Sequence, residues 1–297
     1  MNALKIFRPL NLAIIGLLQV LTFRFLDFES GYAFLTNPIL WKLVASSIAI
    51  SAAGYLFNDM LDTKTDSINK PEKMYIRFWN IKLAWLSFVL LNAFGLLLSN
   101  SINGSVFFIM FSVVNLMMIY SLWFKRWPFV GNLLVALFAG ISIFVVYVAF
   151  LSQYPLGNIS EEMPQYNQLI RYYAGFAFFI TLIREMIKDL EDYQGDHETG
   201  AKTLPIVLGI TTTRNLTLVL SVFILVVFAQ INIYWFVPSF FQPLKWVVIG
   251  YQIVCVGVPL AAFCFNLSNA RSTENFSFLS QLIKYVMITG FLSMLFL

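Results

Sequence analysis

Charged residues are scarce in this 297-residue chain, in which Asp, Glu, Lys and Arg together make up only 11%. Soluble globular chains carry about 25% of these residues, so this chain has too few to cover a water-exposed surface. Hydrophobic residues make up 59%, which predicts an integral membrane protein with many spans. The formal net charge of +4 does not indicate a nucleic-acid partner, because the basic residues lie in short loops between apolar runs.

Cysteine and histidine are also rare. The two cysteines, Cys255 and Cys264, lie nine residues apart in one apolar run and fall on roughly opposite faces of a helix. They predict neither a disulfide nor a metal site. His197 is the only histidine and lies in a polar segment, so no catalytic dyad is built on it. The short basic N-terminal segment is followed by a long apolar run with no small-residue cleavage pattern, so we expect a retained first span.

Apolar runs dominate what remains. A membrane-spanning helix takes about 20 apolar residues, and nine runs approach or reach that length. They predict an all-α, polytopic membrane protein with a single transmembrane domain over residues 1–297. The runs are 9–26, 38–57, 79–98, 104–123, 129–151, 169–187, 214–233, 245–265 and 279–297.

Basic residues collect in alternate loops. The loops at 27–37, 99–103, 152–168 and 234–244 contain no Lys or Arg. This asymmetry places the N-terminus and the other loops in the cytoplasm and the C-terminus outside, with the cell inner membrane as the expected location. The basic residues of the cytoplasmic side are Lys5, Arg8, Lys64, Lys70, Lys73, Arg77, Lys125, Arg126, Arg184, Lys188, Lys202, Arg214 and Arg271.

A carboxylate motif occurs twice, at the ends of the second and sixth runs. Both copies read D-x-x-D-x-x-x-D and begin 130 residues apart. The matching spacing predicts an internal repeat with two related halves. The aspartates are Asp59, Asp62 and Asp66 in the first motif, and Asp189, Asp192 and Asp196 in the second.

The spacing of the motif suggests a metal site. On one continuous helix, offsets of three and seven place all three carboxylates within about 60° of one face. Such like charges need a cation, and Mg²⁺ typically combines one or two carboxylates with substrate phosphates. Asn58 can add a neutral oxygen, whereas Asp66 and Asp196 lie closer to the loops. A single copy is better explained as a solvated helix end; two matching copies favour the metal site.

Basic residues frame both motifs. Arg184 and Lys188 precede the second motif on the same helix, Lys125 and Arg126 end the fourth run, and Arg8 precedes the first. Cations aimed at a departing diphosphate stabilise its developing charge. For Arg8, Lys125 and Arg126 the alternative is that they only set the membrane topology.

Two further side chains leave alternatives open. Glu185 lies four residues before Asp189 and can act as a metal ligand, a base or a partner for Arg184. Tyr120 can donate to a phosphate, although tyrosine is also common at membrane interfaces.

The motifs resemble those of the UbiA superfamily of intramembrane prenyltransferases over nearly the whole chain. The matching segments are Arg8-Pro9-Leu10-Asn11, Asn58 to Asp66, Tyr120 to Arg126 with Gly131-Asn132, and the second aspartate motif. The resemblance implies nine helices around a lipid-open cavity and a Mg²⁺-bound prenyl diphosphate. It implies metal binding by the six aspartates. It also implies catalytic roles for Arg184, Lys188, Lys125 and Tyr120, and substrate contacts from Arg8, Asn11, Asn58, Arg126 and Asn132.

Within the superfamily, the stretch from Arg184 to Pro205 is similar to enzymes that transfer a geranylgeranyl group to geranylgeranylglyceryl phosphate. It implies a prenylglyceryl phosphate hydroxyl as the acceptor and membrane lipid as the surroundings. Two alternatives stay open: an aromatic acceptor from quinone or haem biosynthesis, and a transporter with an ion site. No obligate protein partner is indicated.

Overall fold

The computed structural model describes residues 2–27, 33–63, 75–153, 163–233 and 245–296. Over these residues the chain is helical and contains no strand, which confirms the predicted fold class. Eight described helical segments are long and apolar enough to cross a membrane. The chain divides into two compact units, residues 1–125 with 141–172 and residues 126–140 with 173–297. Each unit contains one aspartate motif, as the internal repeat predicts.

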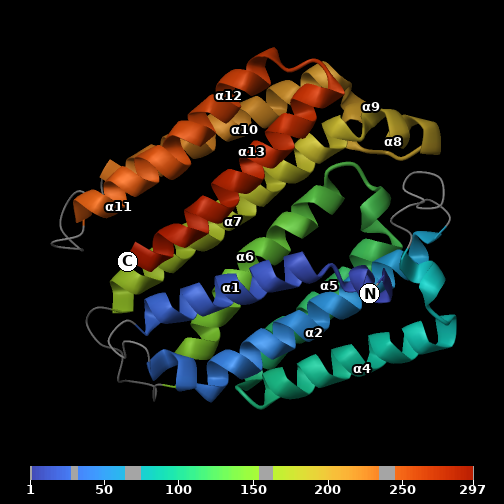
Figure 1. Cartoon of the computed structure of the whole chain (residues 1–297), viewed down its shortest axis with the longest axis vertical. Coiled ribbons are helices and arrows are strands. Elements are labelled where there is room, and N and C mark those ends of the chain that lie inside the picture. The colour runs from blue at the N-terminus through green and yellow to red at the C-terminus, as the bar shows by residue number, and fades with distance from the viewer. Residues whose placement is uncertain (1, 28–32, 64–74, 154–162, 234–244, 297) are drawn as a thin grey trace. The chain divides into compact units, whose positions relative to one another are not determined.

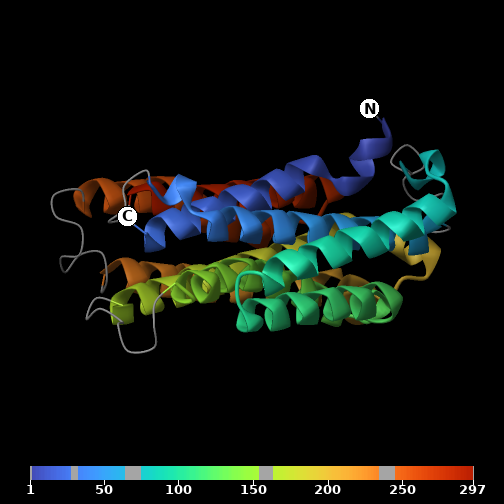
Figure 2. The same cartoon turned by 90° about the horizontal axis from the view of Figure 1, so that it is seen from below.

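The first unit is built around α2 (Pro38–Leu61), which packs against α1 (Pro9–Leu26), α4 (Ile81–Asn100) and α5 (Gly104–Leu122) (Figures 1 and 2). Gly95 permits the close approach of α4 to α2. A Cβ on Gly95 would lie 2.7 Å from Ile50 Cγ1 and 3.0 Å from the Ser46 carbonyl oxygen, and the Ser46 hydroxyl donates to the Gly95 carbonyl at 2.7 Å. Small residues of this kind let membrane helices pack closely.

Short 3₁₀ helices surround the C-terminal end of α2. They are η1 (Asn2–Phe7), η5 (Tyr75–Phe78) and η6 (Phe124–Arg126), with η3 (Ala33–Thr36) at the other end. Ile6 of η1 is fully buried in a cluster with Leu56 and Phe57 of α2 and Ile76 of η5. This packing places the residues just after η1 beside the end of α2, where the first motif begins.

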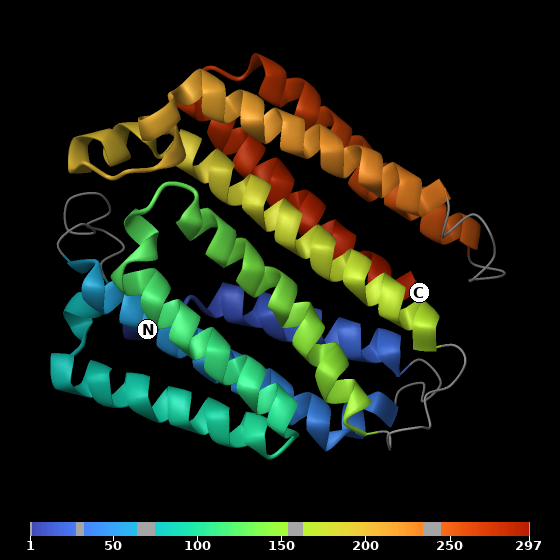
Figure 3. The same cartoon turned by 180° about the vertical axis from the view of Figure 1, so that it is seen from behind.

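The second unit contains the later helices. Among them α12 (Val258–Asn269) packs against α10 (Ile210–Ile231) and α13 (Thr273–Leu292) (Figure 3). Its core joins Ile183 and Ile187 of α7 (Met163–Glu191) to Leu260 of α12 and Ile283 of α13. The remaining elements are α8 (Tyr193–Thr199), α9 (Leu204–Leu208), α11 (Lys245–Gln252), the π-helical η8 (Ile253–Gly257) and η9 (Ser293–Phe296). Helix α6 (Val130–Leu151) and α7 both cross the boundary between the units.

The predicted run 245–265 is interrupted by η8 because Pro259 lacks an N–H. It therefore cannot bond to the carbonyl of Cys255, four residues earlier. The Thr289 hydroxyl of α13 lies 2.8 Å from that carbonyl, closer than the 3.0 and 3.2 Å that separate it from carbonyls of its own helix. The freed carbonyl thus becomes a polar link between two membrane helices.

The predicted sixth run, 169–187, lies in α7, which is not among the eight strongly apolar segments. Arg171, Arg184 and Glu185 lie within it and lower its hydropathy. The last helix begins at Thr273, six residues before the predicted run. A capping box between Ser272 and Asn275 extends it through polar sequence.

Candidate active site

The first motif lies where α2 ends. Asn58 and Asp59 belong to its last turn, and Asp62 caps it by donating its backbone N–H to the Asn58 carbonyl at 3.0 Å. The Thr63 hydroxyl donates to the Met60 carbonyl at 3.0 Å and closes the helix end. Asn58 and Asp62 therefore lie one turn apart, at the boundary where a membrane helix gives way to polar chain.

Asp59 is buried, and its Oδ1 forms an ion pair with Nη2 of Arg8 at 3.0 Å. The guanidinium of Arg8 also lies 4.9 Å from the ring centroid of Tyr55, one turn earlier on α2. Arg8 has φ 50° and ψ 61° directly before Pro9, a left-handed conformation that costs a non-glycine residue about 1–2 kcal/mol. Packing of η1 and the two side-chain contacts hold it there, so Arg8 lies in a fixed position beside the motif.

Asp62 and Asn58 share one cation. The Lys125 ammonium, carried by η6 just after α5, forms an ion pair with Asp62 Oδ2 and donates to Asn58 Oδ1 at 3.3 Å. Both of the first motif's described aspartates thus contact a basic side chain.

The second motif begins at the end of α7, but the helix does not run through it. Helix α7 ends at Glu191, and the chain turns at Asp192, where ψ is 6°, before α8 begins at Tyr193. Asp189 and Asp196 therefore belong to different helices. The second motif therefore does not lie on one unbroken helix, as the spacing argument assumed, although the Asp196 carboxylate still raises the pKa of Asp189.

Asp189 accepts a hydrogen bond from a neutral amide: Asn132 Nδ2 of α6 donates to Asp189 Oδ2 at 2.8 Å. Asp189 lies two residues beyond the predicted span 169–187. Burial, together with the nearby carboxylates of Asp196 and Glu185, raises the pKa of its carboxyl to about 7, against the lowering effects of the Asn132 hydrogen bond and the Lys188 charge. Because desolvation penalises the charged form, a nearby cation would strongly stabilise the ionised form of Asp189.

Two cations near the C-terminal end of α7 meet at Glu185. Arg184 Nη1 lies 2.6 Å from Glu185 Oε1, and Lys188 Nζ lies 3.8 Å from Glu185 Oε2. Of the three roles left open for Glu185, the structure supports that of a partner for Arg184. The apolar surroundings explain the pairing, since an unpaired charge at this depth is costly.

The other predicted site residues are placed as follows. Asn11 lies exposed in the first turn of α1, and Tyr120 is partly buried in the last turn of α5. Asp192 and Asp196 are partly buried at the turn and in α8, and Arg126 ends η6. Asp66 falls outside the described residues. Sequence reasoning missed Tyr55; its position one turn before Asp59 was the available signal.

Over the described residues, no three Asp, Glu, His or Cys side chains gather closely enough to hold a metal ion by themselves. A metal ion at either motif therefore needs further ligands, such as water or substrate oxygens. Carboxylates with an adjoining amide oxygen are the hard donors that suit Mg²⁺ in that situation.

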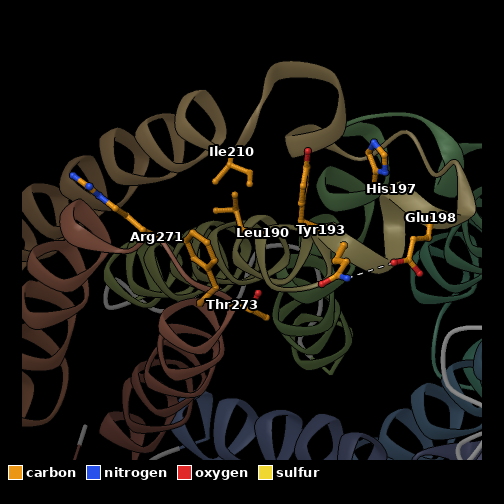
Figure 4. A pocket seen from close by; sticks show the side chains of 9 residues that line it. Leu190, Tyr193, His197, Glu198, Ile210, Arg271 and Thr273 are labelled. Atoms are coloured by element: carbon orange, nitrogen blue, oxygen red, sulfur yellow. Dashed lines mark hydrogen bonds between the residues drawn. The ribbon is translucent and has the colours of Figure 1, made fainter.

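A pocket of about 360 Å³ lies beside the second motif (Figure 4). Its walls combine apolar side chains from α7, α10 and α13 with polar ones from α8. No aspartate of the motif is among its described lining residues, so it is distinct from the candidate metal ligands. The lining residues are Leu190, Tyr193, Gln194, His197, Glu198, Ile210, Arg271, Thr273 and Phe276.

The helices and the two motifs define an integral membrane protein that brings carboxylates and cations together at helix ends. Comparison with known proteins identifies its class: the chain belongs to the UbiA prenyltransferase family, whose profile matches residues 29–282. It is therefore a membrane prenyltransferase, and the transporter alternative is set aside.

Named relatives agree with this assignment. The chain is 32% identical over 222 residues to a digeranylgeranylglyceryl phosphate synthase of Thermococcus sibiricus, covering 74% of this chain and 72% of the relative. It is 33% identical over 206 residues to the enzyme of that name from Saccharolobus solfataricus, covering 68% of each chain.

Solved structures share the fold. A digeranylgeranylglyceryl phosphate synthase structure superposes with a TM-score of 0.69 at 18% identity, covering 99% of this chain and 96% of the other. A UbiA homologue from Archaeoglobus fulgidus, bound to DMAPP and Mg²⁺, superposes with a TM-score of 0.61 at 17% identity, covering 97% and 99%.

Proposed function

We propose that this chain transfers a geranylgeranyl group from its diphosphate to the hydroxyl of a prenylglyceryl phosphate, with Mg²⁺ as the cofactor. The observation that carries the proposal is the meeting of carboxylates with cations and amides at the end of α2 and at the end of α7. The names of the relatives support the choice of acceptor, and the bound DMAPP and Mg²⁺ of the Archaeoglobus homologue support the donor and the metal.

The donor set fits Mg²⁺. The first motif supplies carboxylate oxygens of Asp59 and Asp62 with the amide oxygen of Asn58, and the second supplies Asp189 and Asp192. Asp66 and Asp196 complete the proposed set. Bound Mg²⁺ supplies positive charge that neutralises the diphosphate oxygens as the leaving group departs.

The chain's own cations have the complementary task. Lys125, Arg184 and Lys188 donate hydrogen bonds to a diphosphate and stabilise the negative charge that develops on it. The C1–oxygen bond of the donor breaks and the acceptor oxygen bonds to C1, with release of diphosphate and of the hydroxyl proton. Apolar helices keep bulk water from the allylic carbon, so transfer competes favourably with hydrolysis.

The charge distribution favours an acceptor that carries a phosphate. The cytoplasmic side holds more basic residues than one diphosphate requires once its metal ions are counted. A phosphate on the acceptor matches this surplus and anchors the headgroup at the membrane boundary. The basic residues in question are Lys64, Lys70, Lys73, Arg77, Arg126 and Lys202.

The proposed orientation places both motifs in the cytoplasm of a cell with this protein in its inner membrane. It can be tested by introducing Gln194→Cys, an exposed position on α8, into a Cys255→Ser/Cys264→Ala background. An impermeant maleimide should label it only after the cells are opened. Labelling in intact cells would reverse the topology.

The function is tested with purified protein, Mg²⁺ and labelled geranylgeranyl diphosphate. Geranylgeranylglyceryl phosphate, 4-hydroxybenzoate and a dihydroxynaphthoate are compared as acceptors under one set of conditions. We expect transfer to the phosphoglyceride, with loss on chelation of the metal and recovery when Mg²⁺ is restored. Faster prenylation of an aromatic acceptor would refute the proposed substrate while leaving the family assignment intact.

A further inference from the structure

Lys125 contacts the first motif through the oxygens that a metal ion needs. Its ammonium lies between Asp62 Oδ2 and Asn58 Oδ1. These are one carboxylate and one amide oxygen, the ligand types that hard divalent cations prefer. An ammonium and a divalent ion repel each other at this range, so Lys125 and a divalent ion compete for these two oxygens.

The position of Lys125 suits an exchange of partners. It lies on a three-residue 3₁₀ turn, and its side chain is exposed. A lysine ammonium on a four-carbon stem is compact and easily redirected. Arg8 differs, because the Tyr55 ring and Asp59 hold its guanidinium and its backbone is fixed before Pro9.

A diphosphate changes the balance of this competition. It carries more negative charge than one carboxylate and accepts strong hydrogen bonds from an ammonium. Lys125 therefore gains a better partner when a prenyl diphosphate binds nearby. The oxygens that it leaves are then available to a metal ion.

We propose that Lys125 lowers the affinity of the first motif for free divalent metal by occupying Asp62 and Asn58. It releases these two residues only when a diphosphate binds. Metal binding at the first motif is thereby coupled to substrate. The proposal rests on the metal-dependent function proposed above, and it assigns Lys125 a role in the order of binding as well as in neutralising the leaving group.

The test measures Mn²⁺ binding by electron paramagnetic resonance, without acceptor or turnover. An Asp189→Asn background removes a ligand of the second motif. On that background we expect Lys125→Gln to tighten Mn²⁺ binding about 10- to 100-fold, the range by which outer side chains alter metal affinity. Adding Asp62→Asn should abolish the gain. Lys82→Gln is the matched control, because it removes the same charge from an exposed position of the same unit.

A second measurement uses protein with Lys125 intact. Geranylgeranyl thiolodiphosphate, which resists ionisation, should tighten Mn²⁺ binding more in the Lys125 protein than in the Lys125→Gln variant. Size-exclusion elution and circular dichroism establish that each variant is folded. Equal Mn²⁺ affinities with and without Lys125, or equal enhancement by the diphosphate, overturn the proposal. Because no prenyl transfer is needed, this failure is distinguishable from failure of the proposed function.

Discussion

In the first unit, Asp59 and Asp62 each contact a basic side chain, whereas in the second unit Asp189 accepts a hydrogen bond from the neutral amide of Asn132. The cations nearest Asp189 along α7 are instead engaged with Glu185. Two motifs with one spacing therefore have different electrostatic surroundings. The partners come from different elements: Arg8 precedes α1, Lys125 lies in the turn after α5, and Asn132 lies at the start of α6.

The largest expected effect comes from removing one metal ligand in either unit. Asp59→Asn and Asp189→Asn should each lower kcat/KM on the order of 10²–10³-fold, the loss typical when one group that stabilises transition-state charge is removed. Asp27→Asn, at the other end of α1, is the matched control and should retain activity.

The same two variants should differ in their effects on the stability of the protein. Asp59→Asn breaks an ion pair whose Arg8 side chain is 46% exposed, so the loss should stay below about 1 kcal/mol. Asp189→Asn removes the desolvation cost of a carboxylate and should leave the melting temperature unchanged or higher. Retained activity in both variants at saturating Mg²⁺ would contradict the metal-site hypothesis.

Asn132→Ala tests whether the amide that donates to Asp189 supports metal binding at the second motif. Loss of the 2.8 Å hydrogen bond leaves Asp189 without the donor that orients it, and we expect a 10- to 100-fold rise in the Mg²⁺ concentration needed for half-maximal activity. Asn115→Ala, on α5, removes an amide that bonds only within its own helix at 2.7 Å among the described contacts. An unchanged Mg²⁺ requirement for Asn132→Ala would show that this contact does not support metal binding.

Glu185→Gln tests the anchoring of the cations. The amide cannot neutralise Arg184 and Lys188, so both should be less well placed for a diphosphate, and KM for the prenyl diphosphate should rise about tenfold. Glu185→Asp should recover part of the affinity, whereas Glu274→Gln, exposed in the first turn of α13, should have no effect. A lowered KM would indicate instead that Glu185 repels the substrate.

Thr289→Val should have the smallest effect and should change stability alone. It removes the hydroxyl that donates to the Cys255 carbonyl beside Pro259, at a cost of about 1 kcal/mol. Thr217→Val is a suitable comparison, because the Thr217 hydroxyl bonds to Thr213 within its own helix at 2.8 Å. Thermal unfolding should show the larger loss of stability for Thr289→Val, with activity retained in both variants. Equal losses would show that the hydrogen bond to Cys255 contributes no more than one within a single helix.

Much of the architecture could be predicted from the sequence. Long apolar runs and few charges predict membrane helices because the bilayer requires about 20 apolar residues per span, and eight described segments meet that condition. The repeated aspartates indicated the candidate site because closely spaced like charges need a cation, and the motif occurs twice. The family assignment followed from those residues and was confirmed. The predictions of a single domain, of the six metal ligands and of the substrate contacts stay predictions.

Apolar length and residue spacing are local properties, and the sequence by itself determined the helices and the two places where carboxylates accumulate. Tertiary structure alone decided which charge meets which. Arg8 reaches Asp59 across 51 positions, and Asn132 reaches Asp189 across 57. It also decided that the chain turns at Asp192 and that Thr289 bonds to the Cys255 carbonyl. These contacts depend on how helices pack, because hydrogen bonds and ion pairs form only over a few ångströms.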